Sequence, residues 1–355
     1  MFSALIHEEK MKTRFALIGA GMVSDAHARS IMELPYAELG VVFSRTEEKA
    51  KAFAAKYGVE WTTCLADVLG RKDIDAAIIT TAPYNHKPQA IAVMRSGKHV
   101  LVEKPMAIST AECDEMTAVV RETGRKLGAV FQNRFKKGVR RAREFIEAGR
   151  LGNILHISGY VKWYRPQSYY EANDWRGKTA KEGGGVIFSQ AGHTLDLMQW
   201  LGGPVEWVFT NMVTAPVHAG IDIENLGCVS MRFANGATGI LEASTALYPG
   251  SAEKLQIHGS RGTITLEAGN ITGWQIRDAA PEDEPGDTRE ETGTGASDPM
   301  AFPITWHKAC IMDFIDAIHS DRPPFIDGFQ ARRLNELCEA AYQSAREMRV
   351  VYLDA

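Results

Sequence analysis

The sequence predicts an α/β chain of two domains, in which a parallel sheet covered by helices is followed by an α+β domain. From Arg14 to about Asn133, short apolar runs alternate with helix-like segments, which is the βαβ rhythm of a parallel sheet buried on both faces. Beyond Leu151 the segments are typical of antiparallel strands, with turn candidates at Asn235-Gly236 and Arg261-Gly262. A length of 355 residues also exceeds one ordinary core.

The domain boundaries follow these changes of pattern. Residues 1–10 carry neither a basic leader nor a long apolar core, and we expect a flexible extension there. We place the first domain at residues 11–133 and the second at residues 134–355. Within the second domain, the acidic stretch 278–298 is rich in Pro, Gly, Asp, Glu and Thr, and predicts a mobile surface loop.

Two helices are expected to close the chain. They run from about Trp306 to His319 and from about Phe329 to Met348, and Arg322-Pro323-Pro324 separates them. Both are candidates to pack back on the first domain.

Composition excludes several classes of partner. A formal net charge of -4 gives no overall attraction to nucleic acid or anionic lipid. No stretch approaches the roughly 18 uncharged apolar residues of a spanning helix. The five cysteines have no paired spacing, which argues against a disulfide framework or a thiolate zinc site. We therefore expect no nucleic-acid or membrane partner, and a cytoplasmic protein.

A glycine-containing turn directly follows the first strand, with the sequence Gly19-Ala20-Gly21-Met22-Val23-Ser24. Gly19 permits a tight turn, Gly21 lets backbone amides approach a pyrophosphate, and the helix that follows stabilises the negative charge with its N-terminus. The third glycine of the usual pattern is replaced by Ser24, which is small enough for close helix packing. In its βαβ context the turn predicts a dinucleotide site, whereas the bland alternative is a merely tight turn.

The end of the second strand bears on the choice of dinucleotide. NAD-specific sites usually place a carboxylate there to bind the adenosine ribose, and this chain has Ser44 followed by Arg45. That chemistry suits a 2′-phosphate, so the sequence favours NADP over NAD. If Arg45 is only a solvated surface charge, NAD remains open.

Polar residues follow the later strands of the first domain, where open α/β sheets bind their ligands. We expect them to converge on the nicotinamide half of the cofactor. Lys104 stands out, because desolvation at a buried strand end would lower its pKa and suit a proton donor and acceptor. The alternative is an exposed loop lysine paired with Glu103. The predicted cofactor residues of this group are Thr81, Pro83, His86, Glu103, Lys104 and Asn133.

His193 is the second candidate for proton transfer. Residues from Ser189 to Leu201 have helical spacing, and the run Gly183-Gly184-Gly185 precedes them. Removing hydride from a carbinol carbon requires a group that takes the hydroxyl proton, and an imidazole can do so. Without further context, a histidine on an apolar helical face is more often a core residue.

The motifs Gly19-Ala20-Gly21, Glu103-Lys104-Pro105 and Gly183-Gly184-Gly185 followed by His193 together resemble the Gfo/Idh/MocA oxidoreductase family. The resemblance spans nearly the whole chain. It implies a Rossmann domain followed by a domain with a large, mostly antiparallel open sheet, and a site between them where Lys104 and His193 contact the reacting hydroxyl. It also implies association through the second sheet into a homodimer or homotetramer.

One position departs from the family pattern. Many members have an aspartate four residues before the histidine, where this sequence has Ser189. A serine cannot act alone as general base, so proton transfer is expected to depend on Lys104 and His193. Asp196, one helical turn beyond His193, could orient it, but a structural role is favoured.

Aromatic and basic residues in the second domain are candidates for substrate binding. Aromatic faces can stack on a pyranose ring, and arginines can bind its hydroxyls or an attached phosphate, although some of these aromatics could simply pack under a long loop. The predicted substrate residues are Tyr164, Arg165, Trp175, Arg176, Ser189, His193 and His307.

The sequence therefore predicts an NAD(P)-dependent dehydrogenase or reductase acting on a secondary hydroxyl or ketone of a sugar, polyol or sugar derivative. Two alternatives stay open. One is a redox-neutral glycosidase of the same family, in which the dinucleotide oxidises the sugar transiently. The other is a dinucleotide-responsive regulator without catalysis. No metal site is expected, because the candidate histidines and aspartate are not grouped at ligand spacings.

Overall fold

The computed structural model describes residues 12–291 and 303–353, so the expected extension at residues 1–10 lies outside the described part. The first domain is built on a six-stranded parallel sheet in the order β3-β2-β1-β4-β5-β6. Its strands are β1 (Thr13–Ile18), β2 (Ala37–Phe43), β3 (Glu60–Thr62), β4 (Ala76–Ile79), β5 (His99–Glu103) and β6 (Leu127–Val130).

Helices cover both faces of this sheet, which is why its central strands are almost wholly apolar. One face packs against α4 and α5, and the other against α1 and α2. The helices are α1 (Met22–Met32), α2 (Glu47–Tyr57), α3 (Leu65–Gly70), α4 (His86–Arg95) and α5 (Thr110–Thr123). A short 3-10 helix, η1 (Pro83–Asn85), leads into α4.

The second domain contains an eight-stranded sheet in the order β13-β12-β11-β7-β10-β9-β8-β14. The pair β7–β10 is parallel and the other six pairs are antiparallel. Its strands are β7 (Ile154–Lys162), β8 (Val205–Val213), β9 (Leu226–Phe233), β10 (Thr238–Ser244), β11 (Lys254–Gly259), β12 (Gly262–Glu267), β13 (Asn270–Ile276) and β14 (Val351–Tyr352).

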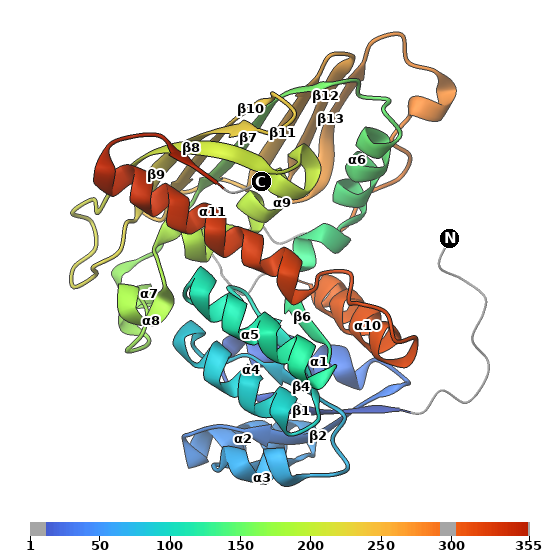
Figure 1. The fold of residues 1–355 in the computed structure, drawn as a ribbon, viewed down its shortest axis with the longest axis vertical. Helices are drawn as coiled ribbons and strands as arrows, with labels where there is room; N and C mark the ends of the chain where they lie inside the picture. Colours follow the sequence, from blue (N-terminus) through green and yellow to red (C-terminus); the bar gives the residue numbers. More distant parts are fainter. Residues whose placement is uncertain (1–11, 292–302, 354–355) are drawn as a thin grey trace.

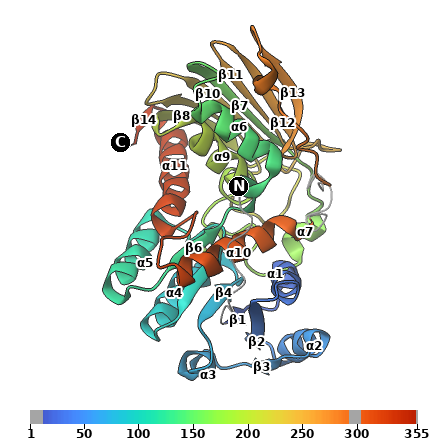
Figure 2. The ribbon, with the colours of Figure 1, turned by 90° about the vertical axis from the view of Figure 1, so that its right-hand side faces the viewer.

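Helices of the second domain lie between its sheet and the first domain (Figures 1 and 2). They include α6 (Lys137–Glu147), α9 (Gly192–Gly202) and α11 (Gly328–Glu347), while the short α7 (Gln167–Glu171) and α8 (Thr179–Glu182) lie at one side. A π-helical turn, η3 (Val186–Gln190), leads into α9. On the opposite face of the sheet, Leu155, Phe209 and Val213 are exposed.

The two C-terminal helices return to the first domain. Helix α10 (Thr305–His319) shares an apolar core with α1 and the first sheet, to which it contributes Ile311, Phe314 and Ile315. Helix α11 packs against both α5 and β8, so it contacts both domains. The apolar core of the first domain therefore includes side chains of α10, far beyond residue 133 in the sequence.

The acidic segment is partly described, since residues 292–298 lie outside the described part. In residues 278–291, Asp283 forms an ion pair with Arg150 and its carbonyl accepts a 2.8 Å hydrogen bond from Trp274 Nε1. Glu290 accepts from the backbone N–H of Lys137 at 2.8 Å. These contacts anchor the described part of the expected loop. Among the described residues, no helix has the length and apolar character needed to cross a membrane.

Candidate active site

The glycine turn after β1 leaves room for a phosphate group. Gly19 has φ +127°, and a Cβ there would lie 2.5 Å from the Thr80 hydroxyl oxygen, so only glycine fits. A Cβ on Gly21 would meet nothing within 4 Å. That open space adjoins the first turn of α1, where Ala20, Met22 and Val23 are partly or largely exposed. An anion placed there would face the helix N-terminus, so these residues fit a dinucleotide pyrophosphate.

Two residues after β2 lie where the adenosine ribose is expected. The hydroxyl of Ser44 accepts a 3.3 Å hydrogen bond from the backbone N–H of Thr46. Arg45 is exposed, and its guanidinium donates to the Tyr84 hydroxyl on η1 at 3.3 Å. The end of β2 therefore presents a hydroxyl and a cation and contributes no carboxylate at these two positions.

The loop after β4 is held together by its own polar groups. Nδ1 of His86 lies 2.8 Å from the Pro105 carbonyl and Nε2 lies 2.9 Å from the Thr81 carbonyl, and the ring is buried. Burial lowers the pKa of His86, and a neutral ring donates from one nitrogen only, so it hydrogen-bonds to one of these two carbonyls. The ring lies between the loops after β4 and β5, and its contact with the cofactor stays a prediction. Thr81 donates its hydroxyl proton to Gln89 at 2.6 Å, and Pro83 is buried in η1.

Glu103 also points into the protein. Its Oε1 accepts a 2.7 Å hydrogen bond from His27 Nε2, and its Oε2 accepts from the Lys104 backbone N–H at 3.1 Å. Burial alone would raise the pKa of Glu103, but the bond with His27 and the nearby cations lower it. Its carboxylate therefore shapes the loop that carries Lys104, and its contact with the cofactor stays a prediction.

His307 joins this cluster, which separates it from the other predicted substrate residues. It lies edge-on to His27 with ring centroids 5.2 Å apart, and its Nε2 is 3.9 Å from Glu103 Oε1. Burial lowers the pKa of His307 to about 4, so the ring is neutral. The ligand-capable atoms of His27, Glu103 and His307 fall within 4.8 Å of one another. However, the 2.7 Å contact is a hydrogen bond, closer than the roughly 3.3 Å between ligands of a tetrahedral zinc ion.

Lys104 reaches across to the second domain. Its ammonium donates a hydrogen bond to the backbone carbonyl of Ser189 in η3. Burial lowers the pKa of Lys104, while Glu103 and Glu182 raise it and Arg165 lowers it further. A lowered pKa increases the fraction of Lys104 present as the amine, which is the form that can accept a proton.

His193 begins the next helix, close enough to Lys104 to feel its charge. Burial lowers the pKa of His193 well below its ordinary value, and the charges of Lys104 and Lys136 lower it further. The ring is therefore neutral at physiological pH. Its Nδ1 is buried and has no hydrogen-bond partner among the described residues.

Close packing against neighbouring residues requires glycines in the run Gly183-Gly184-Gly185, in addition to the tight turn that the run forms. A Cβ on Gly185 would lie 1.9 Å from the Glu224 carbonyl oxygen, and one on Gly184 would lie 2.1 Å from the Tyr342 hydroxyl. The Glu224 carboxylate accepts from the N–H of Gly185 at 2.9 Å and from the Tyr342 hydroxyl at 3.0 Å. These contacts fix the start of η3, which places Ser189 and His193.

Asp196 does not orient His193. It forms a buried, two-pronged ion pair with Arg134, with nitrogen–oxygen distances of 2.6 and 2.8 Å. The pair ties α9 to the segment after β6, where the buried Asn133 also lies. This geometry agrees with the structural role favoured for Asp196.

Arginines and aromatic rings gather near Lys104, on the segment after β7. Arg165 is 2% exposed and packs over the rings of Trp163 and Tyr169. Arg176 lies over Tyr169 at 4.1 Å and over Trp175 at 5.4 Å. Tyr164, farther out, is partly exposed and contacts the ring of Tyr248 edge-on.

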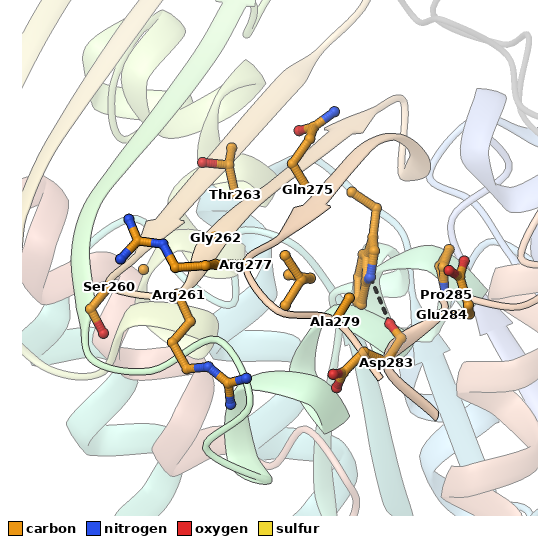
Figure 3. Close-up of a pocket in the computed structure, with 13 residues that line it drawn as sticks. Ser260, Arg261, Gly262, Thr263, Gln275, Arg277, Ala279, Asp283, Glu284 and Pro285 are labelled. Carbon is orange, nitrogen blue, oxygen red and sulfur yellow. Dashed lines mark hydrogen bonds between the residues drawn. The ribbon is translucent and has the colours of Figure 1, made fainter. Parts of the chain in front are cut away.

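A separate hollow of about 760 Å³ lies at the far end of the second sheet (Figure 3). The turn between β11 and β12, the end of β13, Ala279 and residues 283–285 line it. Trp274, which also lines the hollow, donates a hydrogen bond to the Asp283 carbonyl. The hollow contains none of the predicted site residues. The candidate site is therefore the group around Lys104, Ser189 and His193.

Comparison with known proteins decides the family. Residues 13–131 match the oxidoreductase family with an NAD-binding Rossmann fold, and residues 139–265 match the GFO/IDH/MocA C-terminal domain. A relative from Sphingobium sp. (strain NBRC 103272 / SYK-6), 4-carboxy-2-hydroxymuconate-6-semialdehyde dehydrogenase, is 31% identical over 232 residues, which cover 65% of this chain and 71% of the relative. The chain belongs to the Gfo/Idh/MocA oxidoreductase family. The predicted family, fold class and enzyme class are thus confirmed.

Two further Gfo/Idh/MocA comparisons span nearly the whole chain. The structure of the WlbA dehydrogenase from Bordetella pertussis, in complex with NADH and UDP-GlcNAcA, is 31% identical with a TM-score of 0.86, and covers 97% of this chain and 99% of that one. Myo-inositol 2-dehydrogenase from Thermotoga maritima is 23% identical over 352 residues, or 96% of this chain and 98% of the relative.

One acidic residue near the centre of this Gfo/Idh/MocA site was missed by the sequence argument. Glu182, directly before the three glycines, is 3% exposed and contacts Ser189. The signal was a single carboxylate beside a glycine run, which also occurs in ordinary turns. The burial of Glu182 depends on how α8 and η3 pack against the first domain, which the sequence does not show.

Proposed function

We propose that this oxidoreductase transfers hydride between a nicotinamide dinucleotide and a secondary hydroxyl or ketone of a sugar that carries an anionic group. The observation that carries the proposal is the bond from Lys104 to the Ser189 carbonyl. It brings a lysine of lowered pKa next to the neutral His193 and within the electrostatic field of Arg165.

The proposed chemistry divides between the cofactor and two side chains. The bound nicotinamide accepts the hydride in the oxidative direction. Lys104 in its amine form takes the hydroxyl proton, directly or through His193, and returns it in the reductive direction. Because the His193 ring is neutral, one nitrogen can donate to the substrate oxygen while the other accepts. His193→Asn is expected to lower kcat about 10²-fold while NADH affinity stays within a few-fold.

The proposed anionic group follows from the charges around the site. Arg165 and Arg176 are permanent cations, Lys104 adds a third positive charge in its ammonium form, and Glu182 is an acidic residue among them. Arginine binds carboxylate and phosphate groups through paired donors. The WlbA dehydrogenase, 31% identical, is in complex with UDP-GlcNAcA, and this supports a sugar acid or nucleotide sugar.

A substrate panel tests this proposal. Purified protein is given NAD or NADP with UDP-GlcNAcA, UDP-GlcNAc, glucuronate or myo-inositol, and the absorbance of reduced nicotinamide is followed. We expect turnover with at least one sugar that carries a carboxylate or a diphosphate, and a kcat/KM at least ten-fold lower with the uncharged myo-inositol, since a hydrogen-bonded charge pair contributes about 1.5–3 kcal/mol. Equal rates on neutral and acidic sugars would contradict the anionic group. Sugar consumption without net reduction would instead favour the redox-neutral reaction.

We also propose a preference for NADP over NAD. Its support is the hydroxyl of Ser44 and the exposed guanidinium of Arg45 at the end of β2. The WlbA dehydrogenase in complex with NADH argues for the other choice. Parallel fluorescence titrations with NADPH and NADH decide the matter. Arg45→Ala is expected to weaken NADPH binding about ten-fold and NADH binding little, because an exposed ion pair to phosphate contributes about 1 kcal/mol.

Assembly and location are proposed on narrower grounds. The exposed Leu155, Phe209 and Val213 on the uncovered face of the second sheet suit a homodimer or homotetramer joined there. Light scattering of wild type and Phe209→Asp tests it, and an unchanged mass would contradict it. All five cysteines are free thiols, which supports the cytoplasm.

A further inference from the structure

Glu182 is a buried carboxylate that the proposed proton transfer does not use. It is the last residue of α8, which packs against η1 of the first domain. Its Oε2 accepts a 2.8 Å hydrogen bond from the backbone N–H of Gly177. A carboxylate 3% exposed needs strong partners to be retained there.

Ser189 connects Glu182 to Lys104. The backbone carbonyl of Ser189 accepts from the Lys104 ammonium, and the Ser189 side chain lies near enough to Glu182 to lower the pKa of that carboxyl. The Ser189 hydroxyl is also placed to donate to the Gly185 carbonyl at 2.8 Å.

Few charged groups act on Lys104 and Glu182. Glu103, Glu182 and Arg165 act on Lys104, and His193 beside it is neutral. Arg176, Lys104 and the N–H of Gly177 act on Glu182. Burial nevertheless raises the pKa of Glu182 to about 7. Glu103 is held by His27, so Glu182 is the carboxylate near Lys104 that changes charge around neutral pH.

We propose that Glu182 is a positioning residue whose carboxylate, held against Ser189, governs how readily Lys104 takes up and gives up the proton of the reaction. An ionised Glu182 stabilises the ammonium form of Lys104, and a neutral residue in its place favours the amine. The inference rests on the proposed function only where it assigns that proton to Lys104.

The experiment measures the protonation of the Lys104 side chain directly and needs no substrate. The full-length protein with NADH is treated with trace acetic anhydride across a pH series, and mass spectrometry gives the acetylation rate of Lys104. In Glu182→Gln the midpoint of this curve is expected to fall by about one pH unit, so that labelling below the midpoint is about ten-fold faster. Glu171→Gln, an exposed change of the same charge on α7, is the matched control and is expected to match wild type.

Activity supplies the second readout, with the sugar that the panel identifies. The pH at which kcat/KM reaches half of its maximum should fall in Glu182→Gln by the same amount as the labelling midpoint. A merely structural role would lower kcat/KM at every pH without changing that midpoint. If Glu182→Gln folds poorly, Glu182→Asp, which withdraws the charge by one methylene, should give a midpoint between those of wild type and Gln.

The outcomes separate this inference from the proposed function. An unmoved Lys104 midpoint in a folded Glu182 variant overturns the inference, whatever the activity. A moved midpoint together with full activity of Lys104→Met keeps the inference about Glu182 and Lys104, and overturns the catalytic use of Lys104.

Discussion

Lys104 and Ser189 are joined by a hydrogen bond from side-chain nitrogen to backbone carbonyl, although 85 positions separate them in the chain. The bond crosses from the loop after β5 in the first domain to η3 in the second. It aligns the proposed proton carrier with the start of the helix that bears His193. The relative position of the domains therefore determines the geometry of the site.

The first prediction concerns Lys104 itself. Lys104→Met keeps most of the side-chain volume and removes the amine, so turnover should fall about 10²- to 10⁴-fold, the usual contribution of a positioned acid–base group. Affinity for NADH should stay within a few-fold, since the turn after β1 is untouched. Stopped-flow absorbance and fluorescence titration measure the two quantities. Lys72→Met, an exposed change, is the control, and normal turnover in Lys104→Met would overturn the assignment.

Substituting the two glycines of the first turn should affect different properties: folding stability at Gly19 and dinucleotide affinity at Gly21. Gly19→Ala places a Cβ against Thr80 at φ +127° and should lower the free energy of unfolding by about 1–3 kcal/mol. Gly21→Ala enters open space, so stability should change by less than about 1 kcal/mol while dinucleotide affinity falls at least about ten-fold. Urea denaturation and NADH titration of both variants test this. Unchanged NADH affinity in Gly21→Ala would remove the pyrophosphate from this position.

Local patterns were sufficient for the elements and for the first half of the site. The βαβ rhythm predicted the parallel sheet, and the turn at Gly19 to Gly21 lies between β1 and α1 as expected. Such features depend on neighbouring residues and on strand-end geometry, which spacing reveals. The two C-terminal helices were also recognised, because their apolar periodicity is long and proline separates them.

The rest depends on contacts between distant segments. Gly185 contacts Glu224 across 39 positions and Tyr342 across 157, so packing that spacing does not show explains the glycines. His86 and Glu103 were assigned to the cofactor because they follow strands, yet their side chains turn inward to partners that the sequence does not indicate. Glu182 was missed for the same reason.

Asp196 and Arg134 provide a test of structural against catalytic roles. Asp196→Ala leaves Arg134 buried without its partner and should lower the free energy of unfolding by about 3–5 kcal/mol. The double variant Asp196→Leu with Arg134→Met should lose less, because no charge is left buried alone. Chemical denaturation of the three proteins measures these differences. A pH–rate profile of Asp196→Ala with a displaced limb, at near-normal stability, would assign the residue to proton transfer instead.

The raised pKa of Glu224 predicts that the free energy of unfolding falls as the pH rises. Burial raises the pKa of this carboxyl to about 7, although its hydrogen bonds with Ile187, Gly185 and Tyr342 oppose that rise. A raised pKa means that the folded state binds the proton more tightly than the unfolded state. The contribution is therefore fully present below the unfolded pKa of 4.5 and is lost as the pH rises through about 7, a loss of about 3 kcal/mol.

Glu224→Gln isolates this effect, because the amide cannot ionise. Gln has one acceptor oxygen for the donors that Glu224 serves, so the variant should be less stable at pH 4.5. The difference in free energy of unfolding between the wild type and Glu224→Gln should then decrease by about 3 kcal/mol between pH 4.5 and pH 8. Only the wild type has a carboxyl that ionises in the buried site and destabilises the folded state. Urea denaturation at several pH values measures both proteins, and parallel curves would show that Glu224 ionises in the folded state as it does in water.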